Sequence, residues 1–174
     1  MIGLVTEDDT GAGAFPVKED ERMGYRNFTP RQALHRAIGK EVEAQIMYEI
    51  YAGKVEDRQA KNLLEELARE ELGHKLALEK IDPDHPGTFR TPEISSGELG
   101  EFFDRPEISK NATMQEVLRY AIAEETDAFT FYSSLTDYTN DKDFLDLLNR
   151  LASEEKKHKQ RLEQLYDSMF QPEN

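Results

Sequence analysis

The chain has 174 residues, of which 33% are charged and 37% hydrophobic, and its net charge is −14. The length suits one domain, and the negative charge argues against nucleic acid or an anionic membrane surface as a partner. The absence of cysteine excludes disulfides, a thiolate nucleophile, and cysteine-ligated zinc or iron–sulfur sites. No apolar run approaches the roughly 18 residues of a membrane span, and the start "MIGLVTEDDT" lacks a basic segment, so we expect a cytoplasmic protein.

The N-terminal segment differs in character from the rest of the chain. Residues 1–28 hold glycines and a proline among acidic residues with no sustained period, which predicts an irregular arm. Residues 29–174 are expected to form one helical domain. Its first helix should span about 30–52, because Thr29 and Gln32 form the pattern of a capping box.

Three further helices are predicted from the same start and stop signals. They run from Asp57 to about 81, from Thr113 to about 137, and from Asn140 or Asp141 to about 168. Residues 82–112 are rich in proline, glycine and serine, which allows one short helical piece at "SGELGEFF". Two helical hairpins with short loops, joined by one long connection, indicate an all-α four-helix bundle with a crossover between its second and third helices.

The two hairpins also resemble each other in sequence. When the chain is shifted by 84 residues, 10 of 22 positions in the second helix of each hairpin are identical, which indicates an internal duplication and a pseudo-two-fold axis. Both second helices carry Glu-x-x-His within this match. The repeated motif is the strongest candidate for a functional site.

Each helix has an apolar stripe with the three-and-four spacing of a buried face, and acidic or imidazole side chains interrupt every stripe. On the first and third helices, a tyrosine follows the glutamate two turns later. The interrupting residues are Glu41, Glu71, His74, Glu125, Glu155 and His158, and the tyrosines are Tyr48 and Tyr132.

Four carboxylates inside one bundle need compensation, because burying an unpaired carboxylate costs several kcal/mol or forces its protonation. Two divalent cations would balance the four charges, with the neutral histidines as nitrogen donors. Oxygen and imidazole ligands without sulfur suit iron or manganese, and zinc less specifically. The pattern therefore predicts a dinuclear metal site in the core.

Other polar residues are assigned more ordinary roles. Glu70 and Glu154 lie just off the stripes, where we expect surface charges, with support of the site as the alternative. His35 and His85 are expected in solvent. The two tyrosines are either plain core aromatics or groups that hydrogen-bond a carboxylate or donate an electron, and both interpretations stay open.

The segments "AIGKEVEAQIMYEIYA", "LLEELAREELGHKLALEKI", "AIAEETDAFTFYSSL" and "LLNRLASEEKKHKQRLEQL" resemble the four helices of the rubrerythrin branch of the ferritin-like superfamily. The resemblance covers about residues 30–167 and implies a ferritin-like bundle with two iron ions. It further implies that Glu41 and Glu125 are terminal ligands, that Glu71 and Glu155 bridge, and that His74 and His158 take one iron each.

The resemblance implies a di-iron oxidoreductase that couples oxidation of a diferrous centre to reduction of hydrogen peroxide or dioxygen. Tyr48 and Tyr132 are its candidate catalytic residues, and a homodimer or larger homo-oligomer is expected. Without cysteines there is no rubredoxin domain, so a separate protein must donate electrons. Manganese or a mixed metal pair stays open.

One departure from the family pattern weakens the assignment of peroxidase activity. Typical rubrerythrins carry an extra glutamate one turn after the third-helix ligand, where this chain has Ala128, and the matching position is Ala44. The symmetric six-ligand set also resembles the ferroxidase centre of bacterioferritin. A ferroxidase for iron storage or detoxification, or a bundle that binds metal only for structure, are therefore the alternative functions.

Overall fold

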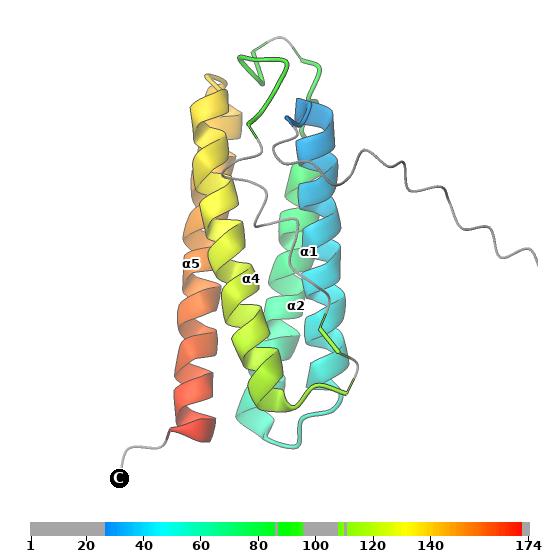
Figure 1. The fold of residues 1–174 in the computed structure, drawn as a ribbon, viewed down its shortest axis with the longest axis vertical. Coiled ribbons are helices and arrows are strands. Elements are labelled where there is room, and N and C mark those ends of the chain that lie inside the picture. Colours follow the sequence, from blue (N-terminus) through cyan, green and yellow to red (C-terminus); the bar gives the residue numbers. More distant parts are fainter. Residues whose placement is uncertain (1–26, 86, 96–107, 110, 172–174) are drawn as a thin grey trace, which may run out of the picture.

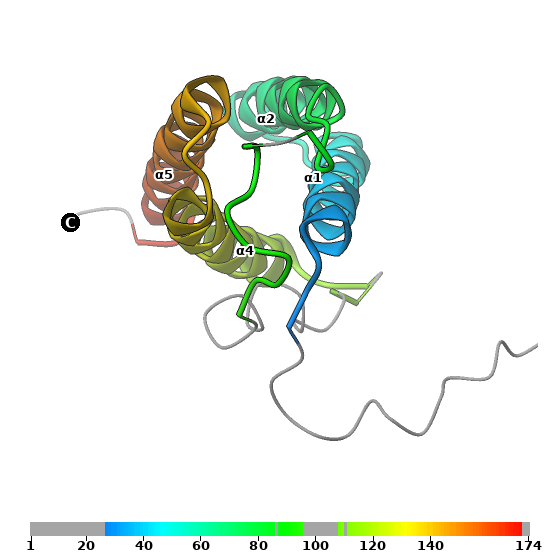
Figure 2. The ribbon, with the colours of Figure 1, turned by 90° about the horizontal axis from the view of Figure 1, so that it is seen from above.

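The computed structural model describes residues 27–85, 87–95, 108–109 and 111–171, and it confirms the predicted all-α four-helix bundle (Figure 1). Seen from the end, the helices follow one another around a ring in the order α1, α2, α5, α4 (Figure 2). None of the helices in this part of the chain combines the length and apolar composition that crossing a lipid bilayer requires. The helices are α1 (Pro30–Ala52), α2 (Arg58–Leu78), α4 (Met114–Leu135), the short 3-10 helix η2 (Thr136–Tyr138) and α5 (Lys142–Phe170).

Side-chain caps start all four long helices at the predicted residues. Thr29 accepts a hydrogen bond from the backbone of Gln32, whose side chain returns one to the cap, and Thr113 forms the same capping box at α4. Asp57 and Asp141 each accept from the third residue of their helix at 2.8 Å. These caps satisfy backbone N–H groups that have no partner within the helix, so local sequence determines where each helix begins.

The ends of the helices depart from the sequence-based bounds by a few residues. α2 ends at Leu78 rather than near residue 81, because Lys80 and Ile81 donate to carbonyls three residues back and tighten the last turn. α4 ends at Leu135 and continues as η2, whereas α5 extends two residues further than predicted, to Phe170.

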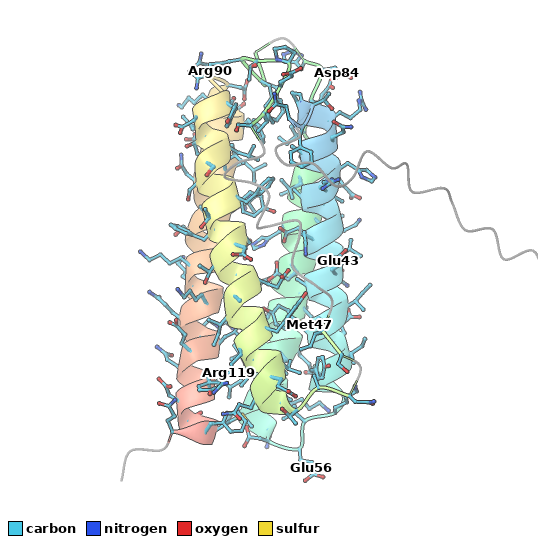
Figure 3. The ribbon with its side chains drawn as sticks, in the orientation of Figure 1. Glu43, Met47, Glu56, Asp84, Arg90 and Arg119 are labelled. Carbon is cyan, nitrogen blue, oxygen red and sulfur yellow. The ribbon has the colours of Figure 1, made fainter. Side chains whose placement is uncertain are left out.

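The connection between α2 and α4 is hydrogen-bonded to the residues that precede α1. Phe28 and Ile94 exchange two backbone hydrogen bonds of 2.9 and 2.7 Å, and both side chains are buried. Asp84 and Arg90 mark this end of the bundle, and Glu56 in the α1–α2 loop marks the other (Figure 3). The short helix predicted at "SGELGEFF" and residues 1–26 of the predicted arm lie outside the described residues.

The apolar core is divided into two clusters by a layer of polar side chains. The upper cluster lies toward the end of the bundle that Asp84 and Arg90 mark. It includes Leu34, Ala37, Leu78, Ala128, Phe131, Leu148 and Ala152. The lower cluster includes Met47, Leu64, Ala68, Leu118, Ala121, Leu162 and Leu165. On every long helix the interrupting glutamate falls between members of the two clusters. Apolar packing on both sides therefore holds the polar layer in the middle of the bundle.

Candidate metal centre

The structure brings the six predicted ligands together in this polar layer. Each of the six residues is at most 5% exposed: Glu41, Glu71, His74, Glu125, Glu155 and His158. Their candidate ligand atoms form two groups, within each of which all atoms lie within 4.8 Å of one another. The first group is Glu41, Glu71, His74 and Glu155, and the second is Glu71, Glu125, Glu155 and His158. Glu71 and Glu155 belong to both groups, so the geometry provides two adjoining sites that share two carboxylates.

The two Glu-x-x-His motifs face each other because α2 and α5 lie side by side in the bundle. A spacing of three residues places the carboxylate and the imidazole of one motif on the same helix face. The rings of His74 and His158 are stacked with centroids 5.4 Å apart and an angle of 14° between their planes. Nδ1 of each ring faces the carboxylates, at 2.9 Å from Glu155 for His74 and 3.0 Å from Glu71 for His158.

Burial and charge crowding change the proton affinities of these groups. Burial raises the pKa of Glu41 from 4.5 to about 7, and burial together with the charges of Glu71 and Glu41 raises the pKa of Glu155 well above its ordinary value. Burial alone would lower the pKa of His74, but the close carboxylates of Glu155, Glu41 and Glu71 outweigh it and raise that pKa. Without metal, the layer thus retains protons as its compensating positive charge.

Three buried atoms of the layer indicate what else could supply that charge. Glu71 Oε1, Glu155 Oε1 and His158 Nδ1 have no partner with hydrogen-bond geometry among the described residues, although ion-pair distances near 3 Å join them to neighbouring ligand atoms. Close approach without hydrogen-bond geometry is expected of donor atoms arranged around a shared cation. The residues present therefore fit a pair of metal ions with oxygen and imidazole ligands.

The tyrosines hydrogen-bond to the carboxylates of the opposite hairpin. Tyr48 on α1 donates its hydroxyl proton to Glu125 on α4, and Tyr132 on α4 donates to Glu41 on α1. Burial, followed by the charges of these glutamates, raises the pKa of both tyrosines well above 10, so both remain protonated donors. The hydrogen-bonding interpretation is confirmed, whereas electron donation stays a prediction.

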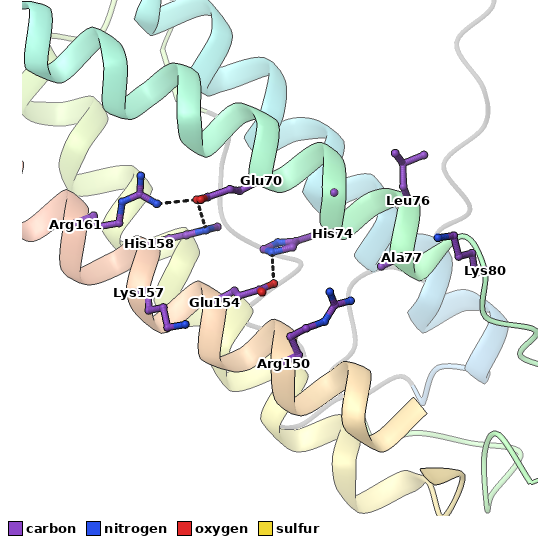
Figure 4. A pocket seen from close by; sticks show the side chains of 11 residues that line it. Glu70, His74, Leu76, Ala77, Lys80, Arg150, Glu154, Lys157, His158 and Arg161 are labelled. Carbon is purple, nitrogen blue, oxygen red and sulfur yellow. Dashed lines mark hydrogen bonds and ion pairs between the residues drawn. The ribbon is translucent and has the colours of Figure 1, made fainter. Parts of the chain in front are cut away.

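The structure shows the alternative role of Glu70 and Glu154, support of the site, rather than the preferred interpretation as plain surface charges. Glu154 Oε2 lies 3.0 Å from Nε2 of His74, and Glu70 Oε2 lies 2.9 Å from Nε2 of His158, so each supports the histidine of the other helix (Figure 4). Both side chains are close to one-third exposed. A carboxylate on Nε2–H orients the ring and leaves the Nδ1 lone pair directed at the ligand cluster.

A signal for these two residues was present in the sequence. Glu70 and Glu154 each stand directly before a ligand glutamate and match each other at the 84-residue offset. The stripe analysis gave this role only as the alternative because it considered each helix alone, and the histidine that each glutamate contacts lies on a different helix. His35 and His85 are exposed, as predicted.

A small cavity lies on the opposite side of the carboxylates from the histidines. It has a volume of about 20 Å³, and Lys40, Ala44, Glu124 and Ala128 line it together with all four ligand glutamates. Lys40 Nζ and Glu124 Oε2 form an ion pair of 3.2 Å across the space between α1 and α4, and both side chains are at most 15% exposed. The ligand cluster therefore has a cavity on the α1–α4 side and imidazoles on the α2–α5 side.

The sequence profile of the rubrerythrin family matches residues 32–166, which include nearly all of the four long helices and the six clustered residues. The chain belongs to the rubrerythrin family. No curated protein is similar enough in sequence to count as a relative.

Solved structures with the same architecture support the fold assignment. A Thermotoga maritima protein, provisionally described as a ferritin-like diiron-carboxylate protein, is 22% identical with a TM-score of 0.62, covering 81% of this chain and 96% of that one. A hypothetical protein from Pyrococcus furiosus is 25% identical with a TM-score of 0.63, covering 80% and 89%.

A third similar structure joins two domain types. It is an Anabaena variabilis protein that contains DJ-1/ThiJ/PfpI-like and ferritin-like domains, and it is 20% identical with a TM-score of 0.57. The match covers 95% of this chain and 48% of that one. These likenesses show a ferritin-like fold for this member of the rubrerythrin family.

The raised pKa of Glu41 predicts the pH dependence of the metal-free protein. A folded-state pKa of about 7 against an ordinary 4.5 stabilises the fold fully below pH 4.5, and this contribution is lost as the pH rises to about 7. We expect the melting temperature of the metal-free protein to fall between about pH 5 and pH 7.5, whereas metal ions should stabilise more at the higher pH. Circular dichroism melts measure both. An equal or higher melting temperature of the metal-free protein at the upper pH would contradict this account.

The contacts at Nε2 predict that Glu154 contributes to metal affinity without binding metal. Glu154→Gln should weaken Fe(II) or Mn(II) binding by roughly 10- to 100-fold, because loss of a carboxylate that orients a metal-binding histidine has that effect. Competition with a chelator of known affinity measures the change. Glu163→Gln is the matched control, since Glu163 is an exposed residue of α5 that pairs with Lys159. Equal affinities of the two variants would show that Glu154 has no role in orienting His74.

Proposed function

We propose that this chain is a di-iron oxidoreductase that couples oxidation of a diferrous centre to reduction of hydrogen peroxide or dioxygen. The observation that carries the proposal is the pair of buried four-residue groups that share Glu71 and Glu155. Glu71 and Glu155, which belong to both groups, would be shared by the two irons, whereas Glu41 and Glu125 would each hold one. His74 and His158 would each offer one imidazole nitrogen to the pair.

Charge balance supports a pair of divalent ions over a single one. Four glutamates carry four negative charges, which two divalent cations cancel while the imidazoles stay neutral. A single divalent ion would leave two buried carboxylates that must either be protonated or remain charged at a cost of several kcal/mol each. Family membership and the absence of sulfur ligands favour iron, with manganese as the other candidate.

When bound, the metal pair would supply two electrons, which with two protons convert one hydrogen peroxide to two waters. The protein residues supply position and access. The hydroxyls of Tyr48 and Tyr132 hold the carboxylates of Glu125 and Glu41 in place. Each tyrosine is a buried phenol that also lies two helical turns after the glutamate of its own helix. The tyrosines are therefore the candidate catalytic residues for electron or proton donation to the centre.

The size of the cavity between α1 and α4 favours a small molecule as the oxidant. Its volume of about 20 Å³ slightly exceeds the roughly 10–15 Å³ that one water requires on the same measure. The methyl groups of Ala44 and Ala128 border it, and the ion pair of Lys40 with Glu124 lies beside it. A space of this size beside the ligand glutamates has room for a small molecule such as peroxide or dioxygen.

The same alanines favour one alternative function. Since neither Ala44 nor Ala128 offers an additional carboxylate, the centre keeps a symmetric set of six ligands. Such a centre also suits a ferroxidase, in which Fe(II) is the substrate and Fe(III) leaves for storage.

Anaerobic titration of the metal-free protein with Fe(II), followed by stopped-flow mixing with peroxide or oxygen, tests the proposal. We expect saturation at two irons per chain and faster oxidation by stoichiometric peroxide than by oxygen. Glu71→Ala should abolish two-iron binding because it removes a bridging carboxylate. Glu66→Ala, which changes an exposed glutamate of the same helix, should behave as the native protein.

Three results would redirect the interpretation. Preference for oxygen with release of Fe(III) would favour the ferroxidase. Binding of two irons without reaction with either oxidant would indicate a structural metal site. Failure to bind iron stoichiometrically would overturn both the site and its function.

A further inference from the structure

A groove of about 580 Å³ runs between α2 and α5 on the histidine side of the ligand cluster (Figure 4). His74 and His158 form part of its lining, together with the two glutamates that contact their Nε2 atoms. This groove lies on the other side of the cluster from the small cavity between α1 and α4. Nothing in the proposed reduction of peroxide uses it.

The groove is positively charged although the chain as a whole is strongly negative. Four cations and two carboxylates line it: Lys80, Arg150, Lys157 and Arg161 with Glu70 and Glu154. Arg161 binds Glu66 and Glu70 at 2.7 Å. In the part of the chain that the structure describes, no hydrogen bond or ion pair engages the side chains of Lys80, Arg150 or Lys157. In a chain of net charge −14, three such cations on one groove indicate an anionic occupant.

Gly73 keeps the groove free of a side chain next to His74. It lies in the interior of α2, where glycine costs about 1 kcal/mol relative to alanine. A Cβ at this position would meet no atom of the described residues within 4 Å, so internal packing does not require glycine here. Gly73 borders the groove next to His74, and a side chain at this position would occupy space beside the imidazole.

The floor of the groove is connected to the ligand cluster by short contacts. Nε2–H of His74 donates a hydrogen bond of 3.0 Å to Glu154 Oε2, and Nδ1 of the same ring lies 2.9 Å from Glu155. Glu70 and His158 form an equivalent path. A donor seated in the groove would be separated from the ligand atoms by one carboxylate and one imidazole, a continuous route of bonds and short polar contacts.

We propose that the α2–α5 groove is the docking site of an acidic electron-donor protein, which passes electrons to the metal centre along the His74 and His158 paths. The inference rests on the proposed function, because a centre that gives two electrons to peroxide must regain them. Two one-electron transfers return two ferric ions to the ferrous state, and the donor is oxidised by one electron in each. Carboxylates of the donor would pair with Lys80, Arg150 and Lys157.

Stopped-flow reduction of the oxidised iron-loaded protein by a reduced acidic ferredoxin tests the inference. Arg150→Glu/Lys157→Glu should slow this reduction at least tenfold, and raising salt from about 20 to 300 mM should slow the native protein while affecting the variant little. The matched control is Lys156→Glu, which introduces the same kind of charge reversal on α5 outside the groove and should alter the rate less than twofold.

A steric variant tests the role of Gly73. Gly73→Leu should weaken the calorimetrically measured affinity of ferredoxin for the oxidised iron-loaded protein. Gly39→Leu is the matched control, because Gly39 also lies within a helix, a Cβ added there would also meet no described atom within 4 Å, and Gly39 does not line the groove. Both variants should keep two irons per chain and the native rate of oxidation by peroxide.

The outcomes separate this inference from the proposed function. Equal rates for the Arg150→Glu/Lys157→Glu and Lys156→Glu variants would overturn it, as would equal ferredoxin affinities of the Gly73→Leu and Gly39→Leu variants. If the charge variant were also slower with a small uncharged reductant, which needs neither protein docking nor electrostatic attraction, the change would lie in the metal centre and the inference would fail. A lack of reaction with peroxide would remove the proposed function while leaving the docking comparison intact.

Discussion

The structure depends on the burial of four carboxylates and two imidazoles in the middle of a helical bundle. Each group alone would destabilise an apolar core by several kcal/mol, so the layer persists only if its charges are compensated together. In the metal-free state protons provide that compensation, as the raised pKa values of Glu41 and His74 show. Two divalent cations would provide it without protonating the ligands. Stability and the proposed function would then rest on the same charge balance.

The supporting contacts of the layer cross between the two helical hairpins. Tyr48 and Tyr132 join α1 and α4 by binding the carboxylate of the opposite helix, and Glu70 and Glu154 join α2 and α5 through the histidines. Each hairpin consequently positions the ligands of the other. The centre also has two distinct sides, one with a small cavity between α1 and α4 and one with a basic groove between α2 and α5.

Much of this arrangement was predictable from the sequence because it follows from helix periodicity. Capping residues determined the helix starts, and three-and-four spacing placed the six clustered residues on buried faces. For Glu70 and Glu154 the sequence favoured surface charges over the supporting role that the structure shows, since their contacts depend on the level at which α5 passes α2. The position of Arg150 and Lys157 on the groove has no sequence signature for the same reason. The pseudo-two-fold repeat and the extent of the N-terminal arm stay predictions.

The most direct test of the account is the location of metal in the crystal. Diffraction data from iron-loaded crystals, collected on both sides of the iron absorption edge, would show anomalous peaks at bound iron. The account predicts two peaks per chain, each within bonding distance of one imidazole Nδ1, with Glu71 and Glu155 between them. A single peak, or peaks outside the layer, would contradict the claim that a pair of cations compensates the buried carboxylates.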